Sequence, residues 1–259
     1  MSFDKYFPRW DADLYDQSET QTEDVELLQR LIGGRKNLNA FEVACGSGRI
    51  LLPLAHDGHR MTGIDRNNLM IAKLFEKAKG MTGFTVIQDD AVVADWGKGY
   101  DLVIVAGNIL LNIVSDADPL ETQRQFIQKA YEALGPGGYL FMDNNGFVHP
   151  EPAFNQPGTR MIFDGTDSNG VYGRYMLMDS SYNAATHTCS GKRRWELTAP
   201  GEETYSKEEL YSKFIPSIAH MESWVTQAGF SVELSYGDYS GNPIGENTSR
   251  AIYWARKQK

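Results

Sequence analysis

The chain has 259 residues, 41% hydrophobic and 23% charged, with a formal net charge of −9. These values are typical of a globular protein with a sizeable core, and the acidic balance argues against a nucleic-acid partner, which needs a basic face. No apolar run approaches the roughly 20 residues that span a bilayer, and the polar N-terminus does not resemble a secretory signal. Two cysteines give neither a disulfide framework nor metal-ligand spacing. We therefore expect a cytoplasmic protein with no metal and no membrane partner.

Strand-like apolar runs alternate with helical periodicity from about residue 39 to residue 145. The segment 101–106 is almost wholly apolar, as is typical of a strand buried on both faces. Alternation of this kind predicts a doubly wound α/β fold with a parallel sheet. The expected strands are 39–44, 59–65, 84–87, 101–106 and 139–142, and the expected helices are 49–57, 67–79 and 119–134.

The pattern changes after Asn145. Tyr, Thr, Ser and Gly become frequent, and period-2 stretches are separated by turn signals such as Asp-Ser-Asn-Gly at 167–170. This pattern predicts an inserted antiparallel sheet of three or four strands. A helix over 217–228 then ends at Gly229, which has the position of a C-terminal cap. The last expected strands are 231–236 and 250–256.

These patterns divide the chain into three parts. Residues 1–36 form an N-terminal flap of short helices, because aromatic residues are frequent there but periodicity is weak. Residues 37–148 and 217–259 form the ligand-binding core. Residues 149–216 form an inserted antiparallel lid or substrate subdomain.

The most informative stretch is residues 41–50, Phe-Glu-Val-Ala-Cys-Gly-Ser-Gly-Arg-Ile. A strand-like run meets Gly46 and Gly48 and then passes into an apolar helical run. Glycine exposes the backbone where a ligand approaches and permits positive φ. The acidic Glu42 indicates a ligand that carries positive charge. The loop lacks both the Lys-Ser/Thr pair of a P-loop and the third glycine of a dinucleotide fingerprint.

The other strands also end in polar groups that suit one ligand. Asp65 follows the second strand, where a carboxylate can accept hydrogen bonds from two ribose hydroxyls. Asp-Asp-Ala at 89–91 follows the third strand and suits an adenine edge, and Gly-Asn at 107–108 follows the fourth. Because ligands bind beyond the carboxyl ends of the strands in an open α/β sheet, we expect these groups to share a site.

This series of motifs resembles the class I S-adenosylmethionine-dependent methyltransferases over most of the chain. Residues 42–48 are similar to the family's first motif, and residues 58–65 to its second. Residues 90–91, 100–108 and 134–140 are similar to its later motifs. The resemblance implies a Rossmann-like, seven-stranded, mainly parallel sheet whose last strand is antiparallel. It also implies S-adenosylmethionine as the cofactor and S-adenosylhomocysteine as the product.

Carried over by position, the resemblance implies roles for single residues. Glu42 would lie near the methionine amino group, Asp65 would hold the ribose, and Arg66 would flank the adenine. Whether Asp89 or Asp90 meets the adenine edge stays open. The expected cofactor-binding residues are Tyr15, Glu42, Ala44, Cys45, Gly46, Gly48, Asp65, Arg66, Met70, Asp89, Asp90, Ala91, Gly107 and Asn108.

Within the family, Gly-Asn at 107–108 followed by Leu-Asn at 111–112 resembles the small-molecule N-methyltransferases of the glycine and amino-sugar type. The resemblance implies in-line methyl transfer to a small molecule, with an amine nitrogen as the favoured acceptor. A neutral amine needs no strong base, whereas an oxygen acceptor needs a base such as His or Asp. The candidate catalytic residues are Asn108, Asn112, Asp143, Asn144, His149 and Tyr211, and no spacing singles one out.

Three alternatives stay open. They are a small-molecule O-methyltransferase, a nicotinamide-dependent oxidoreductase, and a non-catalytic protein that binds S-adenosylmethionine. The missing third glycine and the acidic Glu42 argue against the oxidoreductase. The Tyr-rich hairpins either cover a pocket, where their rings could surround a cation, or form a homodimer interface.

Overall fold

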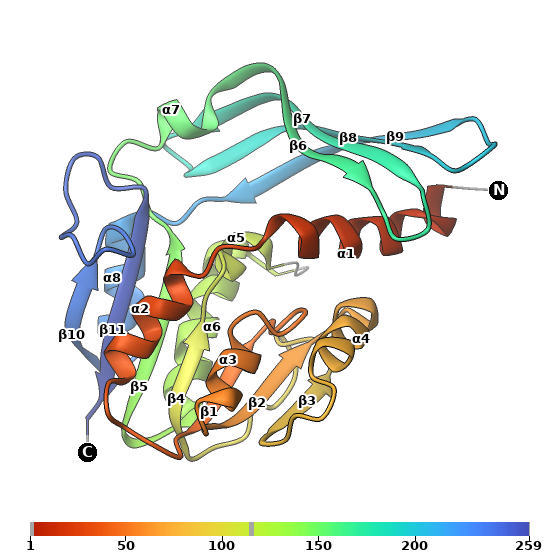
Figure 1. Cartoon of the computed structure of the whole chain (residues 1–259). Helices are drawn as coiled ribbons and strands as arrows, with labels where there is room; N and C mark the ends of the chain where they lie inside the picture. The colour runs from red at the N-terminus through yellow and green to blue at the C-terminus, as the bar shows by residue number, and fades with distance from the viewer. Residues whose placement is uncertain (1–2, 114–116, 259) are drawn as a thin grey trace. The chain divides into compact units, whose positions relative to one another are not determined.

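A computed structural model describes residues 3–113 and 117–258 of the chain (Figure 1). Residues 1–2, 114–116 and 259, which the predicted domain boundaries include, lie outside the described residues. The chain forms two compact units. The antiparallel unit comprises Met1–Thr20 and His149–Ile215, and the core unit comprises Gln21–Val148 and Pro216–Lys259.

The core unit contains a seven-stranded sheet in the order β10-β11-β5-β4-β1-β2-β3 (Figure 1). β11 is antiparallel to both of its neighbours, whereas β5, β4, β1, β2 and β3 pair in parallel. This arrangement confirms the doubly wound, mainly parallel fold expected from the sequence. The strands are β1 (Asn39–Val43), β2 (Arg60–Asp65), β3 (Phe84–Gln88), β4 (Tyr100–Val105), β5 (Leu134–Asn145), β10 (Phe230–Tyr236) and β11 (Arg250–Lys257).

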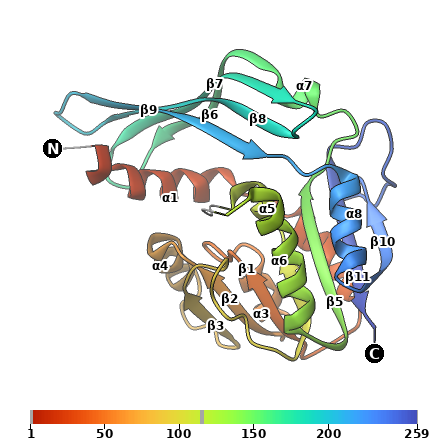
Figure 2. The ribbon, with the colours of Figure 1, turned by 180° about the vertical axis from the view of Figure 1, so that it is seen from behind.

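Helices cover both faces of this sheet. α2 and α3 lie over the face seen in Figure 1, and α6 and α8 lie over the opposite face seen in Figure 2. Three helices begin at a side chain that accepts hydrogen bonds from first-turn amides, as N-caps do: Asn67, Asp118 and Ser217. The helices are α2 (Glu23–Ile32), α3 (Leu51–His56), α4 (Asn68–Lys77), α5 (Ile109–Asn112), α6 (Pro119–Ala133) and α8 (Ile218–Gln227).

The centre of the sheet is fully covered. Leu102, Val103, Ile104 and Val105 of β4 have no exposed surface, which explains why the sequence there is continuously apolar. On β2, a Cβ at position 63 would lie 2.6 Å from the sulfur of Cys45. Gly63 is therefore required for the loop after β1 to lie close to the sheet.

β5 is longer than the predicted strand 139–142. Its pairing with β4 shifts from Leu134 opposite Tyr100 to Tyr139 opposite Leu102. The strand therefore bulges over residues 135–138, where the sequence predicted a glycine turn, and Gly137 has a φ of 80°. The ladder continues on both sides of this bulge, so the turn interrupts the strand without ending it.

The antiparallel unit contains a four-stranded sheet in the order β6-β7-β8-β9, as the period-2 pattern predicts. α1 packs on this sheet through Trp10 and Leu14. A Cβ at Gly173 would lie 2.5 Å from the Trp10 ring, and one at Gly165 would lie 2.6 Å from Leu14. The elements are η1 (Phe3–Lys5), α1 (Phe7–Ser18), α7 (Glu151–Phe154), β6 (Gln156–Thr166), β7 (Tyr172–Asn183), β8 (Thr188–Thr198) and β9 (Thr204–Phe214).

The predicted N-terminal segment 1–36 is divided between the two units. α1 belongs to the antiparallel unit and α2 to the core unit. Among the described residues, none of the helices combines the length and the apolar character needed to cross a membrane.

Candidate functional site

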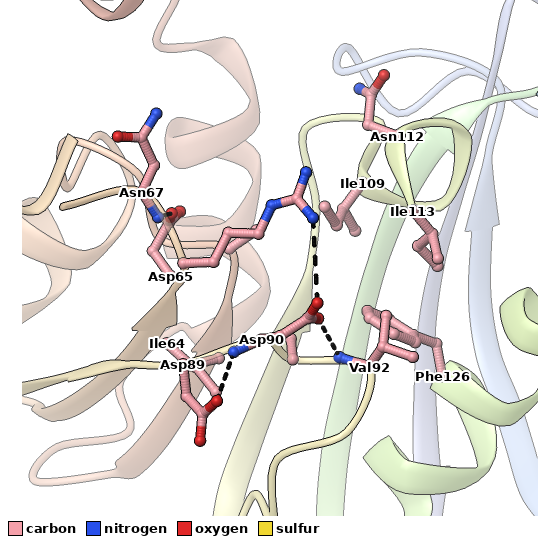
Figure 3. A pocket seen from close by; sticks show the side chains of 13 residues that line it. Ile64, Asp65, Asn67, Asp89, Asp90, Val92, Ile109, Asn112, Ile113 and Phe126 are labelled. Carbon is pink, nitrogen blue, oxygen red and sulfur yellow. Dashed lines mark hydrogen bonds and ion pairs between the residues drawn. The ribbon is translucent and has the colours of Figure 1, made fainter. Parts of the chain in front are cut away.

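A pocket in the core unit is lined at the carboxyl ends of β1, β2 and β3 and by α5 and α6 (Figure 3). It lies beside β1, where the strand order reverses, which is the usual ligand position in such sheets. The lining residues are Ala44, Ile64, Asp65, Arg66, Asn67, Asp89, Asp90, Ala91, Val92, Ile109, Asn112, Ile113 and Phe126.

Asp65, at the end of β2, holds two of the surrounding loops. Its Oδ2 accepts a hydrogen bond from the Gly46 amide at 2.8 Å, and its Oδ1 accepts one from the Asn67 amide at 2.8 Å. The carboxylate is only half-buried and lines the pocket. Because each carboxylate oxygen can accept a second hydrogen bond, Asp65 can also bind hydroxyl groups of a ligand.

The glycine loop adopts left-handed backbone conformations. Gly46 and Gly48 have φ values of 52° and 83°, and Ala44 has a φ of 54°, which is uncommon for a residue with a Cβ. A Cβ at Gly48 would lie 2.8 Å from Leu52 and 2.9 Å from Leu74. Gly48 is thus required by packing as well as by its φ. A Cβ at Gly46 would meet only the methyl end of a methionine side chain, at 3.4 Å.

Glu42 is buried in β1, with 5% of its surface exposed. Burial raises the pKa of its carboxyl to about 8, although the positive charge of Arg49 opposes this effect. Among the described residues, none makes a hydrogen bond to its Oε2. A buried carboxyl with an unpartnered oxygen suits a positively charged or hydrogen-bond-donating ligand group, although Glu42 is not part of the pocket lining.

The turn after β3 is built around two aspartates. Asp90 Oδ1 accepts a hydrogen bond from the Val92 amide at 2.9 Å, and Asp89 Oδ1 accepts one from the Asp90 amide at 2.7 Å (Figure 3). Arg66 lies 4.0 Å from Asp90 Oδ2, but both side chains are substantially exposed, so this ion pair is weak. Asp89, Asp90 and Ala91 all line the pocket, so the geometry does not choose between the two aspartates.

One wall of the pocket is apolar, and sequence reasoning missed it. Figure 3 shows Ile109, Ile113 and Phe126 opposite Asp65 and Asn67. A wall of this kind suits a flat ring, while the polar groups fix its orientation. Ile109 belongs to α5, Ile113 directly follows it, and Phe126 belongs to α6. Their apolar character indicates only burial, so the sequence carries no signal that distinguishes them from core residues.

Asn108 and Asn112 lie at the start and end of the short helix α5. Asn108 has a φ of 62°, and its Oδ1 accepts a hydrogen bond from the Asn145 amide at 2.7 Å. This bond ties the end of β4 to the end of β5. Asn112 lines the pocket, and its Nδ2 donates to the Asn108 carbonyl at 3.3 Å. Gly107, with a φ of 68°, leaves open space where a Cβ would be.

Asp143 and Asn144 are both buried near the end of β5. Asp143 Oδ1 accepts a hydrogen bond from Arg250 Nε at 2.8 Å, and its Oδ2 accepts one from the Tyr239 hydroxyl at 2.9 Å. Both oxygens therefore have structural partners. The Nδ2 of Asn144 donates to the Asn145 carbonyl at 2.8 Å, and no described residue makes a hydrogen bond to its Oδ1.

Cys45, within the glycine loop, packs against Gly63, and the Met70 side chain approaches Gly46; neither residue is part of the pocket lining. Burial raises the pKa of the Cys45 thiol, which makes it a small apolar packing group and not a nucleophile. The remaining predicted residues belong to the antiparallel unit. There, the Tyr211 hydroxyl lies 2.6 Å from Ser180 Oγ, while Tyr15 and His149 are exposed. Their assignment to the site stays a prediction.

Residues 40–138 match a family model described as a methyltransferase domain. This segment includes the glycine loop, Asp65, the turn after β3 and Asn108. A candidate methyltransferase of Geobacillus sp. (strain WCH70) is 23% identical over 221 residues, which cover 84% of this chain and 83% of that protein.

Solved structures share the fold over nearly the whole chain. One is an S-adenosylmethionine-dependent methyltransferase from Clostridium acetobutylicum ATCC 824, with a TM-score of 0.71, 14% identity, and coverage of 95% of this chain and 96% of that one. Another is the sugar N-methyltransferase KedS8 from Streptoalloteichus sp. ATCC 53650, with a TM-score of 0.68, 15% identity, and coverage of 95% and 91%. At these identities the likeness shows the fold alone.

The family match identifies a methyltransferase domain over residues 40–138, and the solved structures show that the whole chain shares the fold of S-adenosylmethionine-dependent methyltransferases. This agrees with the resemblance found in the sequence motifs.

Proposed function

We propose that the protein transfers a methyl group from S-adenosylmethionine to a small-molecule acceptor, and that the acceptor atom is an amine nitrogen. The observation that carries this proposal is the pocket itself. Its lining combines Ala44 after β1, the Asp65 carboxylate at the end of β2, the turn after β3 and the helix after β4. Four separate chain segments contribute, so a single chance motif does not explain it.

The residues present fit this cofactor. Asp65 can accept hydrogen bonds from the two ribose hydroxyls, because its oxygens retain acceptor capacity. The turn of Asp90 and Ala91 would hold the adenine edge against the wall of Ile109 and Phe126. Open space at Gly107 and the unpartnered oxygen of Glu42 suit the methionine end with its ammonium group.

S-adenosylmethionine supplies a methyl group already activated by its positively charged sulfur. The protein therefore has to align the acceptor and exclude water. The described lining of the pocket contains no histidine, tyrosine or lysine, and Asp65, Asp89 and Asp90 all accept hydrogen bonds from backbone amides. The proposed amine acceptor needs no strong base from these groups, because a neutral amine can lose its proton to solvent after the transfer. The fold shared with a sugar N-methyltransferase is consistent with this acceptor.

The inserted antiparallel sheet enters the proposal as the substrate subdomain. Tyr15 of α1 stays a candidate cofactor contact, whereas His149 and Tyr211 are the candidates that would act on the acceptor. An oxygen acceptor would need one of them, or Asp143, as a base. The amine proposal needs none.

Calorimetric titration with S-adenosylmethionine and S-adenosylhomocysteine tests the cofactor. We expect micromolar binding by the native protein and a loss of at least about 50-fold in Asp65→Ala. Asp101→Ala is the matched control, because Asp101 also accepts a backbone hydrogen bond, from Asn39 at 2.8 Å, but lies at the opposite end of the sheet. Absence of binding to both ligands would overturn the proposal.

The acceptor is tested by incubating the protein with S-adenosylmethionine and panels of amines and matched alcohols. We expect S-adenosylhomocysteine to form only with amines. Product formation with alcohols alone would replace the amine acceptor with an oxygen acceptor, and product with neither panel would favour a binding protein without catalysis.

A further inference from the structure

Lys129 makes an unusual set of contacts in the core unit. This residue of α6 is half-buried, and its ammonium donates hydrogen bonds to the carbonyls of Ala91, Val92 and Ala94 at 2.8, 2.9 and 2.8 Å. Three donors are all that a lysine possesses, so the group is fully used. All three acceptors belong to the turn after β3, which lines the pocket.

Trp96 also contacts this turn. Its Nε1 donates to the Ala91 carbonyl at 2.9 Å, so this carbonyl accepts from both Trp96 and Lys129. The Lys129 ammonium also lies 5.0 Å from the centre of the Trp96 ring, within cation–π range. The indole packs between Phe41 of β1 and Phe126 of the pocket wall.

The turn is thereby fixed at both ends. At its start, the Asp90 side chain accepts a hydrogen bond from the Val92 amide. The Asp90 carbonyl accepts two more, from the Val93 amide at 3.1 Å and the Ala94 amide at 2.9 Å. A single helical turn leaves its carbonyls without partners within the turn, and here Lys129 donates hydrogen bonds to those of Ala91, Val92 and Ala94. An ammonium at the carbonyl end of the turn also faces the negative pole of the aligned peptide groups.

A charged side chain is a costly way to hold a surface turn. Burial disfavours the ammonium and lowers the Lys129 pKa, although Asp90 and Asp95 oppose this effect. An apolar side chain could fill the same space without the desolvation cost, but it could not orient three carbonyls. The arrangement therefore constrains where the Asp90–Val92 backbone lies.

We propose that Lys129 is a positioning residue for cofactor recognition: through the carbonyls of Ala91, Val92 and Ala94 it holds the turn after β3 in the geometry that reads the adenine amino group. This inference rests on the proposed function, because it assumes that the adenine occupies the pocket beside Ala91. It goes beyond the proposed function by assigning adenine selectivity to a residue that does not line the pocket.

The experiment compares two ligands on each variant. S-adenosylhomocysteine carries the adenine amino group, and S-inosylhomocysteine carries an oxo group in its place. The dissociation constant of S-inosylhomocysteine divided by that of S-adenosylhomocysteine measures how strongly the site selects the amino group. We expect a ratio above about 10 for the native protein and a ratio reduced at least about threefold in Lys129→Met, which keeps the length and removes the donors.

Two variants separate positioning from general stabilisation. Lys98→Met removes a charge at an exposed position of the β3–β4 connection, which is the connection that contains the turn. The ratio of dissociation constants for this variant should stay native. Lys129→Arg keeps charge and donors and should recover most of the ratio. Under turnover, Lys129→Met should raise KM for S-adenosylmethionine and leave kcat unchanged, because the turn does not touch the methyl group.

The outcomes distinguish this inference from the proposed function. If the native protein binds neither ligand, the proposed function fails. If it binds S-adenosylhomocysteine and Lys129→Met retains the native ratio, the positioning role is overturned. Should Lys129→Met not fold, Lys129→Gln carries the same test, since its shorter uncharged side chain cannot make the three ammonium hydrogen bonds; an unchanged ratio there also overturns the proposal.

Discussion

The two sides of the pocket are built in different ways. The loop after β1 relies on backbone conformation: Ala44, Gly46 and Gly48 all have positive φ, and the close packing at Gly48 leaves no room for a side chain. The segments after β2 and β3 rely on side chains, because Asp65 and Asp90 hold the surrounding amides by hydrogen bonds.

This difference predicts how each side responds to substitution. On the glycine side, an added carbon atom must displace packed residues and strain the backbone, so the cost appears in the free energy of unfolding. On the aspartate side, a lost acceptor leaves an amide without a partner, so the cost is divided between stability and ligand affinity.

The largest effect is expected for Gly48→Ala. Its Cβ would overlap Leu52 and Leu74 at a φ of 83°, and we expect a loss of about 3 kcal/mol in the free energy of unfolding, measured in urea. Gly58→Ala separates the two causes, because Gly58 has a φ of 91° but no atom within 4 Å of an added Cβ. It should lose only about 1 kcal/mol. Equal losses would mean that packing contributes nothing.

Asp65→Asn tests the aspartate side. An amide has one acceptor oxygen, so either Gly46 or Asn67 would face an NH₂ group in place of a carboxylate oxygen. We expect about 2 kcal/mol of destabilisation and weaker binding of S-adenosylhomocysteine. The control is Asp101→Asn, because an amide oxygen can keep the hydrogen bond from the Asn39 amide and Asp101 does not line the pocket. A native affinity in Asp65→Asn would remove this residue from the ligand site.

Glu42 should make stability depend on pH. Its pKa in the folded protein is about 8, above the ordinary value of 4.5, so between these values the folded state keeps a proton that the unfolded state releases. Stability should therefore fall as pH rises through this window and level off above pH 8. Relative to Glu42→Gln, which cannot titrate, we expect a change on the order of 3 kcal/mol between pH 5 and pH 8.

Chemical denaturation of both proteins across this range measures the difference. Glu76→Gln, at an exposed position on α4, should follow the same pH course as the native protein. If the free energies of unfolding of the native protein and Glu42→Gln differ by the same amount at every pH, the pKa of the Glu42 carboxyl is not shifted by folding.

The smallest effect is expected for Arg66→Ala. The Arg66 and Asp90 side chains lie 4.0 Å apart and are 58% and 40% exposed. An exposed ion pair of this kind contributes less than about 0.5 kcal/mol, so the free energy of unfolding in urea should change by less than this amount. Affinity for S-adenosylhomocysteine is a separate readout, and a tenfold loss there would mean that the guanidinium contacts the ligand directly.

The core sheet could be predicted from the sequence because its signals are local. Most of the parallel strands are short runs rich in apolar residues, with glycine or acidic residues at or soon after their ends, and the helices between them have their own periodicity and caps. Asp65 and the turn after β3 were found for the same reason, since the carboxyl ends of parallel strands meet at one edge.

Contacts between distant segments could not be predicted. Lys129 lies 35 to 38 residues from the carbonyls that it binds, and Arg250 lies 107 residues from Asp143. Neither pair has a spacing that a single sequence reveals. The packing of Trp10 against Gly173 was hidden in the same way, so α1 was grouped with α2 in one N-terminal segment, although the two helices belong to different units.

The chain has two cysteines, and each unit holds one of them in its interior. Cys45 belongs to the glycine loop and has 3% of its surface exposed, and Cys189 lies in β8 with 4% exposed. A thiol reagent reaches such groups only when the surrounding structure opens. The modification rate of Cys45 therefore reports the opening of the core unit, and that of Cys189 the opening of the antiparallel unit. Both rates can be measured in a single labelling experiment on the unaltered protein.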